Sequence, residues 1–213
     1  MKKGFTLSEV LITLGIIGVI AVLTIPAVMK NYRNRLYVSQ LEKVYAQIAT
    51  ASQAIMNDEH TAHFYETTAA KATSCSNATK GECEAGAGYF LNNYFKPLKR
   101  NCGPGKANSC AADTYTSING TTAGKLAGDY CIQTTNGAAI CMEYNATDKL
   151  SHINVDVNGP SAPNMTGRDV FYMTIQDTGL ITDYKNSDPS KCSNPTSEGC
   201  LNKVMQAGWK MEY

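Results

Sequence analysis

Residues 1–29 read MKKGFTLSEVLITLGIIGVIAVLTIPAVM, and their composition differs from that of the rest of the chain. Two lysines stand near the start, and no charged side chain occurs in 10–29. Twenty residues of helix span about 30 Å, which is the thickness of the hydrocarbon core of a bilayer. A helix of a soluble core would show a polar face, whereas only Thr13 and Thr24 interrupt this run. The composition therefore predicts a transmembrane helix over 7–29.

A cleaved secretory signal fits this segment poorly. The apolar part of such a signal is about 7–15 residues long and ends at a small-x-small cleavage site. No such site occurs around 25–30. We therefore expect the apolar segment to remain in the mature protein.

The residues just ahead of the apolar run have a distinctive order. The two lysines are followed by Gly4, by the large apolar Phe5, and then by the acidic Glu9. The sequence Gly-Phe-Thr-Leu-Ser-Glu, followed by a long apolar run, resembles the class III leader of type IV pilins and type II secretion pseudopilins. The resemblance implies that a membrane aspartyl prepilin peptidase cuts after Gly4, on the cytoplasmic side, and removes residues 1–4. It also implies that the new amine of Phe5 is methylated.

Two roles are open to Glu9. The segment from Thr6 to Glu9 is an S/T-x-x-E capping box, in which the carboxylate bonds back to the start of the helix and is favoured by the helix dipole. In the family that the leader resembles, this carboxylate pairs with the N-terminal amine of a neighbouring subunit during assembly, here the amine of Phe5. A carboxylate without a cation in a bilayer costs about 2.5–3.5 kcal/mol or more, which favours such pairing. The two roles are compatible.

The apolar pattern becomes periodic after the uncharged run, which predicts that one helix covers 5–57. Pro26 lacks a backbone N–H and is expected to kink this helix. The later stripe lasts under four heptads, which is short for a coiled-coil dimer, so we expect it to pack on a globular head. The stripe recurs at steps of three and four residues: Tyr37, Leu41, Val44, Ile48, Ala51 and Ile55.

The rest of the chain is long enough for one modest domain, which we expect over 58–213. The protein has 19 basic and 18 acidic residues, and cleavage of the leader would remove two of the basic ones. This balance gives no argument for nucleic acid as an obligate partner.

All eight cysteines follow residue 74, and their even number predicts disulfides and an oxidising compartment. This places the N-terminus in the cytoplasm and the head outside the bacterial inner membrane. Separations of eight and ten residues do not match the C-x₂₋₄-C pairs of structural zinc sites. Eight cysteines allow 105 connectivities, of which we favour pairing between sequence neighbours. The expected pairs are Cys75 with Cys83, Cys102 with Cys110, Cys131 with Cys141, and Cys192 with Cys200.

The third pair depends on the length of a hairpin loop. A two-residue loop, Asn136-Gly137, would set Cys131 opposite Met142 and the two cysteines on different faces. A three-residue loop over 135–137, with Gly137 left-handed, would set Cys131 opposite Cys141.

From about Tyr115 onward the sequence has a strand-like pattern. The candidate strands are separated by turn residues and not by helices, which implies an antiparallel sheet. Packing of one apolar sheet face against the helical stripe gives an α+β fold. The resemblance to pilins implies that this is a pilin-like head, and the cysteines predict that disulfides hold it. The segment 155–173 also resembles a strand-turn-strand segment of the pilin-like family. The expected strands cover 129–134, 138–144, 151–157, 169–176 and 180–182, with short helices over 88–96 and 201–207 and polar loops over 71–88 and 183–199.

Two clusters suggest metal ligands. Asp156, Asn158 and Asp169 gather oxygen atoms around an Asn-Gly turn, and some pseudopilins bind calcium, so these residues form a candidate calcium site. They lack the full D-x-[DN]-x-[DN]-G-x₅-E series, and turn chemistry also accounts for them. His60 and His63 would share a face if the helix continued, which suggests either a metal pair or a solvated helix end. We expect no other cofactor.

No motif indicates an enzyme. The chain has three histidines and lacks G-x-S-x-G, H-E-x-x-H and a dinucleotide fingerprint. The Cys-Gly-Pro-Gly-Lys run at 102–106 lacks the spacing of a phosphate-binding loop. The expected function is structural: a pilin or pseudopilin that polymerises through its N-terminal helix with copies of itself or other pilins.

Such a subunit would depend on the prepilin peptidase and on inner-membrane assembly machinery. It would pass from the inner membrane into a periplasmic or cell-surface filament. The sequence is equally compatible with secretion, adhesion, motility and DNA uptake, and with a major or a minor subunit. The alternative is a single-pass membrane-anchored extracytoplasmic binding domain or enzyme that does not polymerise.

Overall fold

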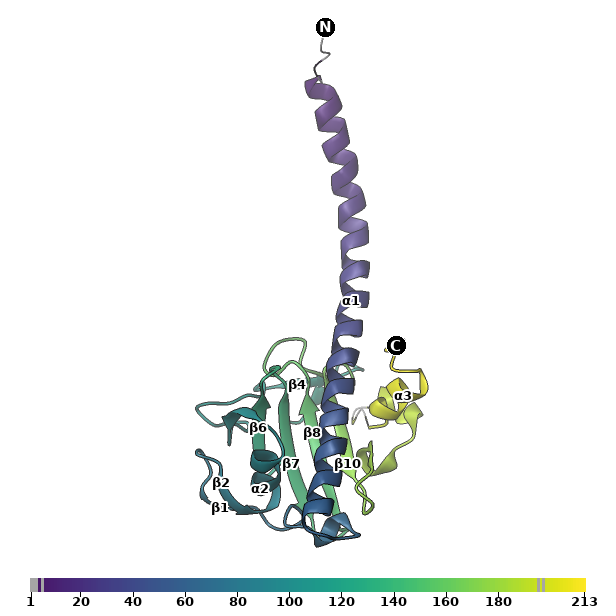
Figure 1. Cartoon of the computed structure of the whole chain (residues 1–213). Helices are drawn as coiled ribbons and strands as arrows, with labels where there is room; N and C mark the ends of the chain where they lie inside the picture. Colours follow the sequence, from purple (N-terminus) through teal and green to yellow (C-terminus); the bar gives the residue numbers. More distant parts are fainter. Residues whose placement is uncertain (1–3, 5, 195, 197) are drawn as a thin grey trace. The chain divides into compact units, whose positions relative to one another are not determined.

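The structure is a computed structural model that describes residues 4, 6–194, 196 and 198–213. The chain divides into two compact units between Leu36 and Tyr37, and helix α1 contributes to both (Figure 1). The helices are α1 (Leu7–Asp58), α2 (Gly86–Asn93) and α3 (Cys200–Gln206), and the 3-10 turns are η1 (Phe64–Glu66), η2 (Tyr184–Asn186) and η3 (Pro189–Ser193).

The first unit contains the apolar part of α1. An 18-residue window of this helix has a mean hydropathy of 2.6 and none of it is buried, so by length and composition the helix can cross a membrane. Pro26 lies inside α1, and the helix continues through it. The kink expected at Pro26 stays a prediction. The large apolar side chains exposed here are Leu7, Val10, Leu11, Ile12, Leu14, Ile16, Ile17, Val19, Ile20, Val22, Leu23, Ile25, Val28, Met29, Tyr32 and Leu36.

The second unit, the head, begins within α1 and is built on a nine-stranded sheet. The strand order is β3-β6-β7-β8-β10-β9-β4-β5, and β11 pairs with β10. A separate hairpin consists of β1 (Ser74–Asn77) and β2 (Glu82–Ala85). The strands of the sheet are β3 (Pro97–Arg100), β4 (Tyr115–Ser117), β5 (Thr122–Ala123), β6 (Tyr130–Thr134), β7 (Ala139–Asn145), β8 (Leu150–Asp156), β9 (Met165–Thr166), β10 (Val170–Ile175) and β11 (Ile181–Asp183).

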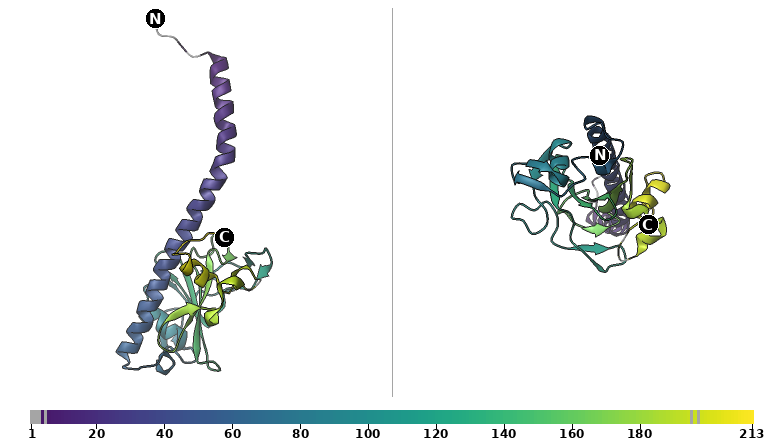
Figure 2. Two further views of the ribbon diagram at one scale, coloured as in Figure 1. Left: turned by 90° about the vertical axis from the view of Figure 1, so that its right-hand side faces the viewer. Right: turned by 90° about the horizontal axis from the view of Figure 1, so that it is seen from below.

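One face of this sheet carries the main core of the head. The α1 stripe packs there, together with α2 and α3, and Figure 2 shows this part of α1 lying along one side of the strands. Six stripe residues and Val38 are no more than 6% exposed, so the expected contact surface is confirmed: Tyr37, Leu41, Val44, Ile48, Ala51 and Ile55. Burying one such side chain contributes roughly 1.5–3 kcal/mol.

The opposite face of the sheet carries a second, smaller apolar cluster, which the expectation of a single apolar face missed. Tyr115, Leu126 and Val170 pack there with the disulfides of β6–β7 and of the loop after β3. Successive side chains of a strand point to opposite faces of the sheet, so Ile140 belongs to the main core and Cys141 to the second cluster. The polar connection between β3 and β6 supplies the cover.

The sheet is mostly antiparallel, as expected, and the five expected strands occur with ends shifted by no more than one residue. The exception is β9, which pairs in parallel with both β10 and β4. Strands β3, β4, β5 and β9 were not expected, because two- to four-residue strands are too short to show an alternating pattern.

Three local expectations are corrected. The helix expected over 88–96 is Gly86–Asn93, and Pro97 begins strand β3 after it. The loop expected over 71–88 contains the β1–β2 hairpin, and the loop over 183–199 contains η2 and η3. The polar composition of these two segments did not indicate the hairpin or the 3-10 turns, because the segments are held by disulfides more than by apolar packing.

The four disulfides join sequence neighbours, as expected: Cys75–Cys83, Cys102–Cys110, Cys131–Cys141 and Cys192–Cys200. Cys131 lies directly opposite Cys141 in the β6–β7 register. Gly137 has φ 92°, and the Thr134 N–H bonds to the Ala138 carbonyl at 2.9 Å, which defines the three-residue loop. The hairpin geometry therefore produces the third pair.

Candidate functional site: the start of the N-terminal helix

The start of α1 forms the capping box that the sequence predicts. The Thr6 backbone N–H donates to Glu9 Oε2 at 2.8 Å, and the Thr6 hydroxyl donates to the same oxygen at 2.7 Å. In return, the Glu9 N–H donates to Thr6 Oγ1 at 3.3 Å. The Val10 N–H bonds to the Thr6 carbonyl, which makes Thr6 the N-cap. The carboxylate therefore lies fixed at the positive end of the helix.

Phe5, the residue expected to carry the methylated amine, lies outside the described residues, as do residues 1–3. Gly4 is described and exposed. A Cβ at Gly4 would meet no atom within 4 Å in the described chain, and its φ lies outside the left-handed region. The fold itself therefore gives no reason for a glycine at this position.

Gly15 and Gly18 show the same openness within α1, since a Cβ at either would meet nothing within 4 Å. Glycine in a helix interior costs about 1 kcal/mol relative to alanine. The large apolar side chains around these glycines are exposed in the isolated chain. A contiguous apolar surface of this kind marks contact with lipid or with another protein.

Residues 1–25 match the family model described as the prokaryotic N-terminal methylation motif. The chain carries the methylation motif typical of type IV pilins and pseudopilins. The motif implies processing by prepilin peptidase, and the α+β head with its long helix is pilin-like. No curated protein and no solved structure matches the chain significantly.

The pilin-like head also contains the candidate calcium residues, and the structure places Asp156 beside the second apolar cluster, in contact with Tyr115. Asp156 is fully buried. Its Oδ2 accepts from the Tyr115 hydroxyl at 2.8 Å, and its Oδ1 accepts from the Asn158 N–H at 3.3 Å. Burial, together with the negative charge of Asp169, raises the pKa of Asp156 to about 8.

Asp169 is also fully buried and closes the turn before β10. Its two oxygens accept from the N–H groups of Met165 at 2.6 Å and Asn164 at 2.8 Å. Burial raises the pKa of Asp169, and these two backbone donors oppose the rise. Of the two carboxyl groups, Asp156 is therefore the one that holds a proton most readily, because fewer backbone donors stabilise its charge.

This geometry does not fit a calcium ion. All four carboxylate oxygens of Asp156 and Asp169 already accept a hydrogen bond. The Asn158 amide donates to the carbonyls of Ser161 and Ala162, which leaves its buried Oδ1 as the one unpartnered acceptor of the proposed ligands. Calcium requires six to eight oxygen ligands. Within the described part of the chain, no group of three or more acidic, histidine or cysteine residues could hold a metal.

The two histidines near the helix end do not share a helix face, because α1 ends at Asp58 and His60 has φ 53°. His63 Nδ1 instead contacts Asp177 Oδ2 at 2.7 Å, and its ring stacks on Tyr65. The histidines therefore belong to the solvated end of the helix.

Sequence analysis missed Asp183, a buried carboxylate that organises the C-terminal part of the head. Its oxygens accept from the N–H groups of Gly199 at 2.6 Å and Asn202 at 3.0 Å, at the start of α3. Burial raises its pKa, while these donors lower it. No sequence signal identifies this cap, because Asp183 lies 17 residues before α3 begins at Cys200.

Proposed function

We propose that this protein is a structural filament subunit, a pilin or pseudopilin, that is cut between Gly4 and Phe5 and polymerises through α1. One observation carries the proposal: the methylation motif directly precedes a helix whose apolar side chains are exposed in the isolated chain. Before assembly, lipid covers this surface. In the filament, neighbouring copies of the helix replace the lipid.

The open glycines support this function. Gly4, Gly15 and Gly18 are not required by contacts within the described chain, although each lowers helix stability or backbone order. Recognition by the peptidase explains the glycine at position 4. Close packing of neighbouring helices explains Gly15 and Gly18. Small residues allow such close approach of helix backbones.

Glu9 is arranged to serve both of its roles. The capping bonds use Oε2, and among the described residues no hydrogen bond reaches Oε1. The free oxygen can accept from the methylated amine of a neighbouring Phe5 without loss of the cap. In a water-excluded helix bundle, an amine without this partner would cost several kcal/mol.

The proposed location follows from the same segment. The N-terminus faces the cytoplasm, where the peptidase acts, and the disulfide-containing head lies outside the inner membrane. Partners are the prepilin peptidase, other pilin subunits and the assembly machinery. An anchored, non-polymerising domain is the second candidate, favoured only by the length and hydropathy of α1.

The test is the N-terminal mass of the protein in its native host, together with filament yield after shearing. We expect the mature chain to begin at Phe5 with one added methyl group. Gly4→Val should block cleavage and filament formation, because its bulk excludes the peptidase, while Gly15→Ala should leave cleavage unchanged. A mature chain that begins at Met1, or normal filaments from Gly4→Val, would contradict the proposal.

A further inference from the structure

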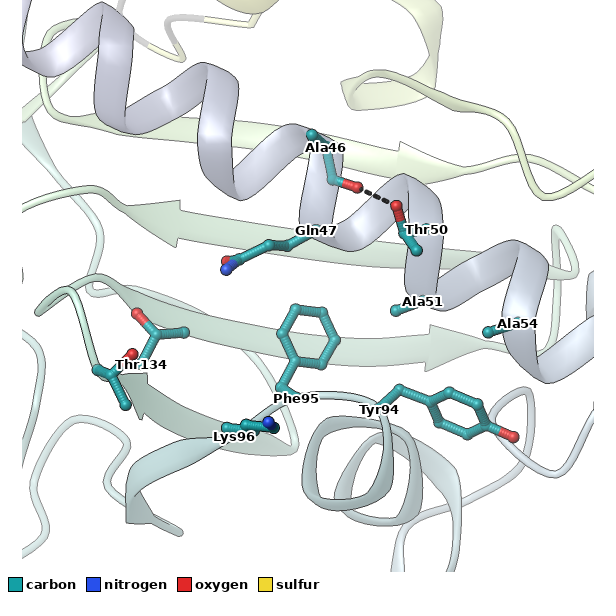
Figure 3. A pocket seen from close by; sticks show the side chains of 10 residues that line it. Ala46, Gln47, Thr50, Ala51, Ala54, Tyr94, Phe95, Lys96 and Thr134 are labelled. Carbon is teal, nitrogen blue, oxygen red and sulfur yellow. Dashed lines mark hydrogen bonds between the residues drawn. The ribbon is translucent and has the colours of Figure 1, made fainter.

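The head contains a cavity of about 450 Å³ between the second half of α1, the α2–β3 connection and the tip of the β6–β7 hairpin. All of its lining residues belong to the head. Figure 3 shows the Phe95 ring pointing toward α1, near Gln47 and Thr50, with Thr134 on one side and Tyr94 on the other. The volume lies within the roughly 300–1,000 Å³ of small-molecule sites.

The apolar part of the lining is flat and small. Ala51 and Ala54 of α1 lie on the side of the helix toward the Phe95 ring (Figure 3). Phe95 and Ala51 are only 8% and 4% exposed, so they form the floor of the cavity, and Ala54 is half-buried beside them.

Three polar groups of the lining have no hydrogen-bond partner among the described residues and come from three different elements. They are the Gln47 amide of α1, the Lys96 ammonium of the α2–β3 connection and the Thr135 hydroxyl of the hairpin tip. Other polar groups of the lining are already bonded: the Thr50 hydroxyl donates to the Ala46 carbonyl and the Thr134 hydroxyl to the Ala138 carbonyl. The cavity therefore offers one cation, one amide and one hydroxyl.

The charged side chains on the β3 side of the cavity are all positive. Lys96 is the one charged residue of the lining, and no Asp or Glu occurs in 85–112. Lys99 and Arg100 continue the basic character along β3, an edge strand of the sheet. At the far end, the Tyr94 hydroxyl donates to Asp58 Oδ2 at 3.0 Å, which engages the nearest carboxylate of α1.

We propose that this cavity binds an acidic saccharide, a pyranose unit that carries a carboxylate. The apolar C–H face of a pyranose ring packs on the apolar floor of the cavity and on Ala54. Its hydroxyls match the Gln47 amide and the Thr135 hydroxyl, which both donate and accept. Its carboxylate matches Lys96.

The proposal does not rest on polymerisation, so binding can be measured on the unassembled full chain in a detergent without a sugar head group. The probe is trigalacturonic acid, titrated calorimetrically at low salt, with trimannuronic acid as a second acidic trisaccharide and maltotriose as the neutral control. We expect the acidic trisaccharides to bind with a sub-millimolar Kd that rises with salt, and maltotriose to bind at least about tenfold more weakly.

Two variants of lining residues and one control variant locate the site. Lys96→Gln should weaken binding of the acidic trisaccharides about tenfold, and Lys99→Gln, a matched control outside the cavity, about twofold or less. Thr135→Val should weaken binding of all three trisaccharides. Both lysines are exposed, so unchanged melting temperatures will show that each variant is folded.

Four outcomes would overturn the proposal. These are absence of binding by both acidic trisaccharides, equal binding of maltotriose, equal loss in Lys96→Gln and Lys99→Gln, and equal affinity for a hexathymidylate strand. The last two would indicate non-specific attraction of anions to β3. Filament formation by Lys96→Gln should be normal, which separates this test from that of the proposed function.

Discussion

The two halves of α1 belong to one helix but differ in the exposure of their apolar side chains. Before residue 37, the large apolar side chains are exposed, with Leu7 78% and Leu23 73% accessible. After it, Leu41 and Ile48 are fully buried against the sheet. The first half is therefore built for surroundings that the chain does not itself supply, and the second half is part of the head.

The glycines show the same division. Gly15 and Gly18 have open space where a side chain would begin. In the head, a Cβ at Gly128 would lie 2.8 Å from the Met142 backbone nitrogen, and one at Gly88 would lie 2.6 Å from the Cys83 sulfur. Internal packing thus explains Gly88 and Gly128, whereas no contact within the described chain explains Gly15 and Gly18.

The largest expected effect concerns pH and the buried carboxyl groups of the head. Burial raises the folded-state pKa of Asp156 to about 8 from its ordinary value of 3.8, so its stabilising effect is complete below about pH 4. That effect is lost as pH rises toward 8, by about 1.4 kcal/mol per pH unit for one proton. The raised pKa values of Asp169 and Asp183 act in the same direction.

Denaturation of the full chain in detergent, followed by Trp209 fluorescence, measures this effect. The Trp209 ring packs against Tyr45 at 5.5 Å between centroids, so it reports on the head. Asp156→Asn keeps an acceptor for the Tyr115 hydroxyl and should flatten the profile between pH 5 and 8. Glu9→Gln, in the exposed first half, should leave the profile unchanged. A wild-type head that gains stability over this range would contradict the assignment.

A pair of core substitutions tests the division of α1 directly. Ile48→Ala should lower the free energy of unfolding of the head by about 2–5 kcal/mol, because Ile48 is fully buried and leaves a cavity. Ile17→Ala makes the same chemical change in the first half and should change head stability by less than about 0.5 kcal/mol. Comparable losses in both variants would mean that the first half contributes to the head core.

Removal of the central disulfide should have the next largest effect. Cys131 and Cys141 close a short loop across β6 and β7, and the chain-entropy model gives roughly 2–3 kcal/mol for such a loop. The double change Cys131→Ala/Cys141→Ala should lower the denaturation midpoint of the head and leave N-terminal processing intact. Processing that fails together with this bond would show that the peptidase monitors the folded head.

The smallest expected effect on folding concerns Glu9. Glu9→Gln keeps most of the capping hydrogen bonds, so local helix stability should fall by about 1 kcal/mol or less and head disulfides should form normally. Assembly should fail, because glutamine does not neutralise the amine of a neighbouring Phe5. Processed, folded protein without sheared filaments is the expected result. Abundant normal filaments would leave Glu9 with capping as its main role.

Several elements of the protein were predictable from local sequence because their causes are local. The α1 stripe follows helical periodicity, and the Cys131–Cys141 pair follows from the left-handed Gly137 of a three-residue loop. The capping box follows from residues three positions apart. Each of these features depends on side chains that lie close together in the chain.

Other elements depend on residues that are distant in sequence, and no local sequence pattern predicts them. Strand β9 has two residues and exists because β4 and β10 lie on either side of it. The second apolar cluster uses the loop after β3 as its cover. For the candidate calcium residues, the sequence shows the two carboxylates but gives no sign of the Tyr115 hydroxyl and the backbone N–H groups that donate to them.

The sequence by itself indicated the N-terminal methylation motif, the apolar helix and the disulfide pairing, because charge, hydropathy and short spacings act over a few residues. The tertiary structure alone decided that Asp156 and Asp169 are buried and accept hydrogen bonds from Tyr115 and from backbone N–H groups. It also decided that Asp183 caps α3 and that Gln47, Lys96 and Thr135 line one cavity. These groups come from separate elements. Packing of the sheet against α1 is what brings such side chains within a few ångströms of each other.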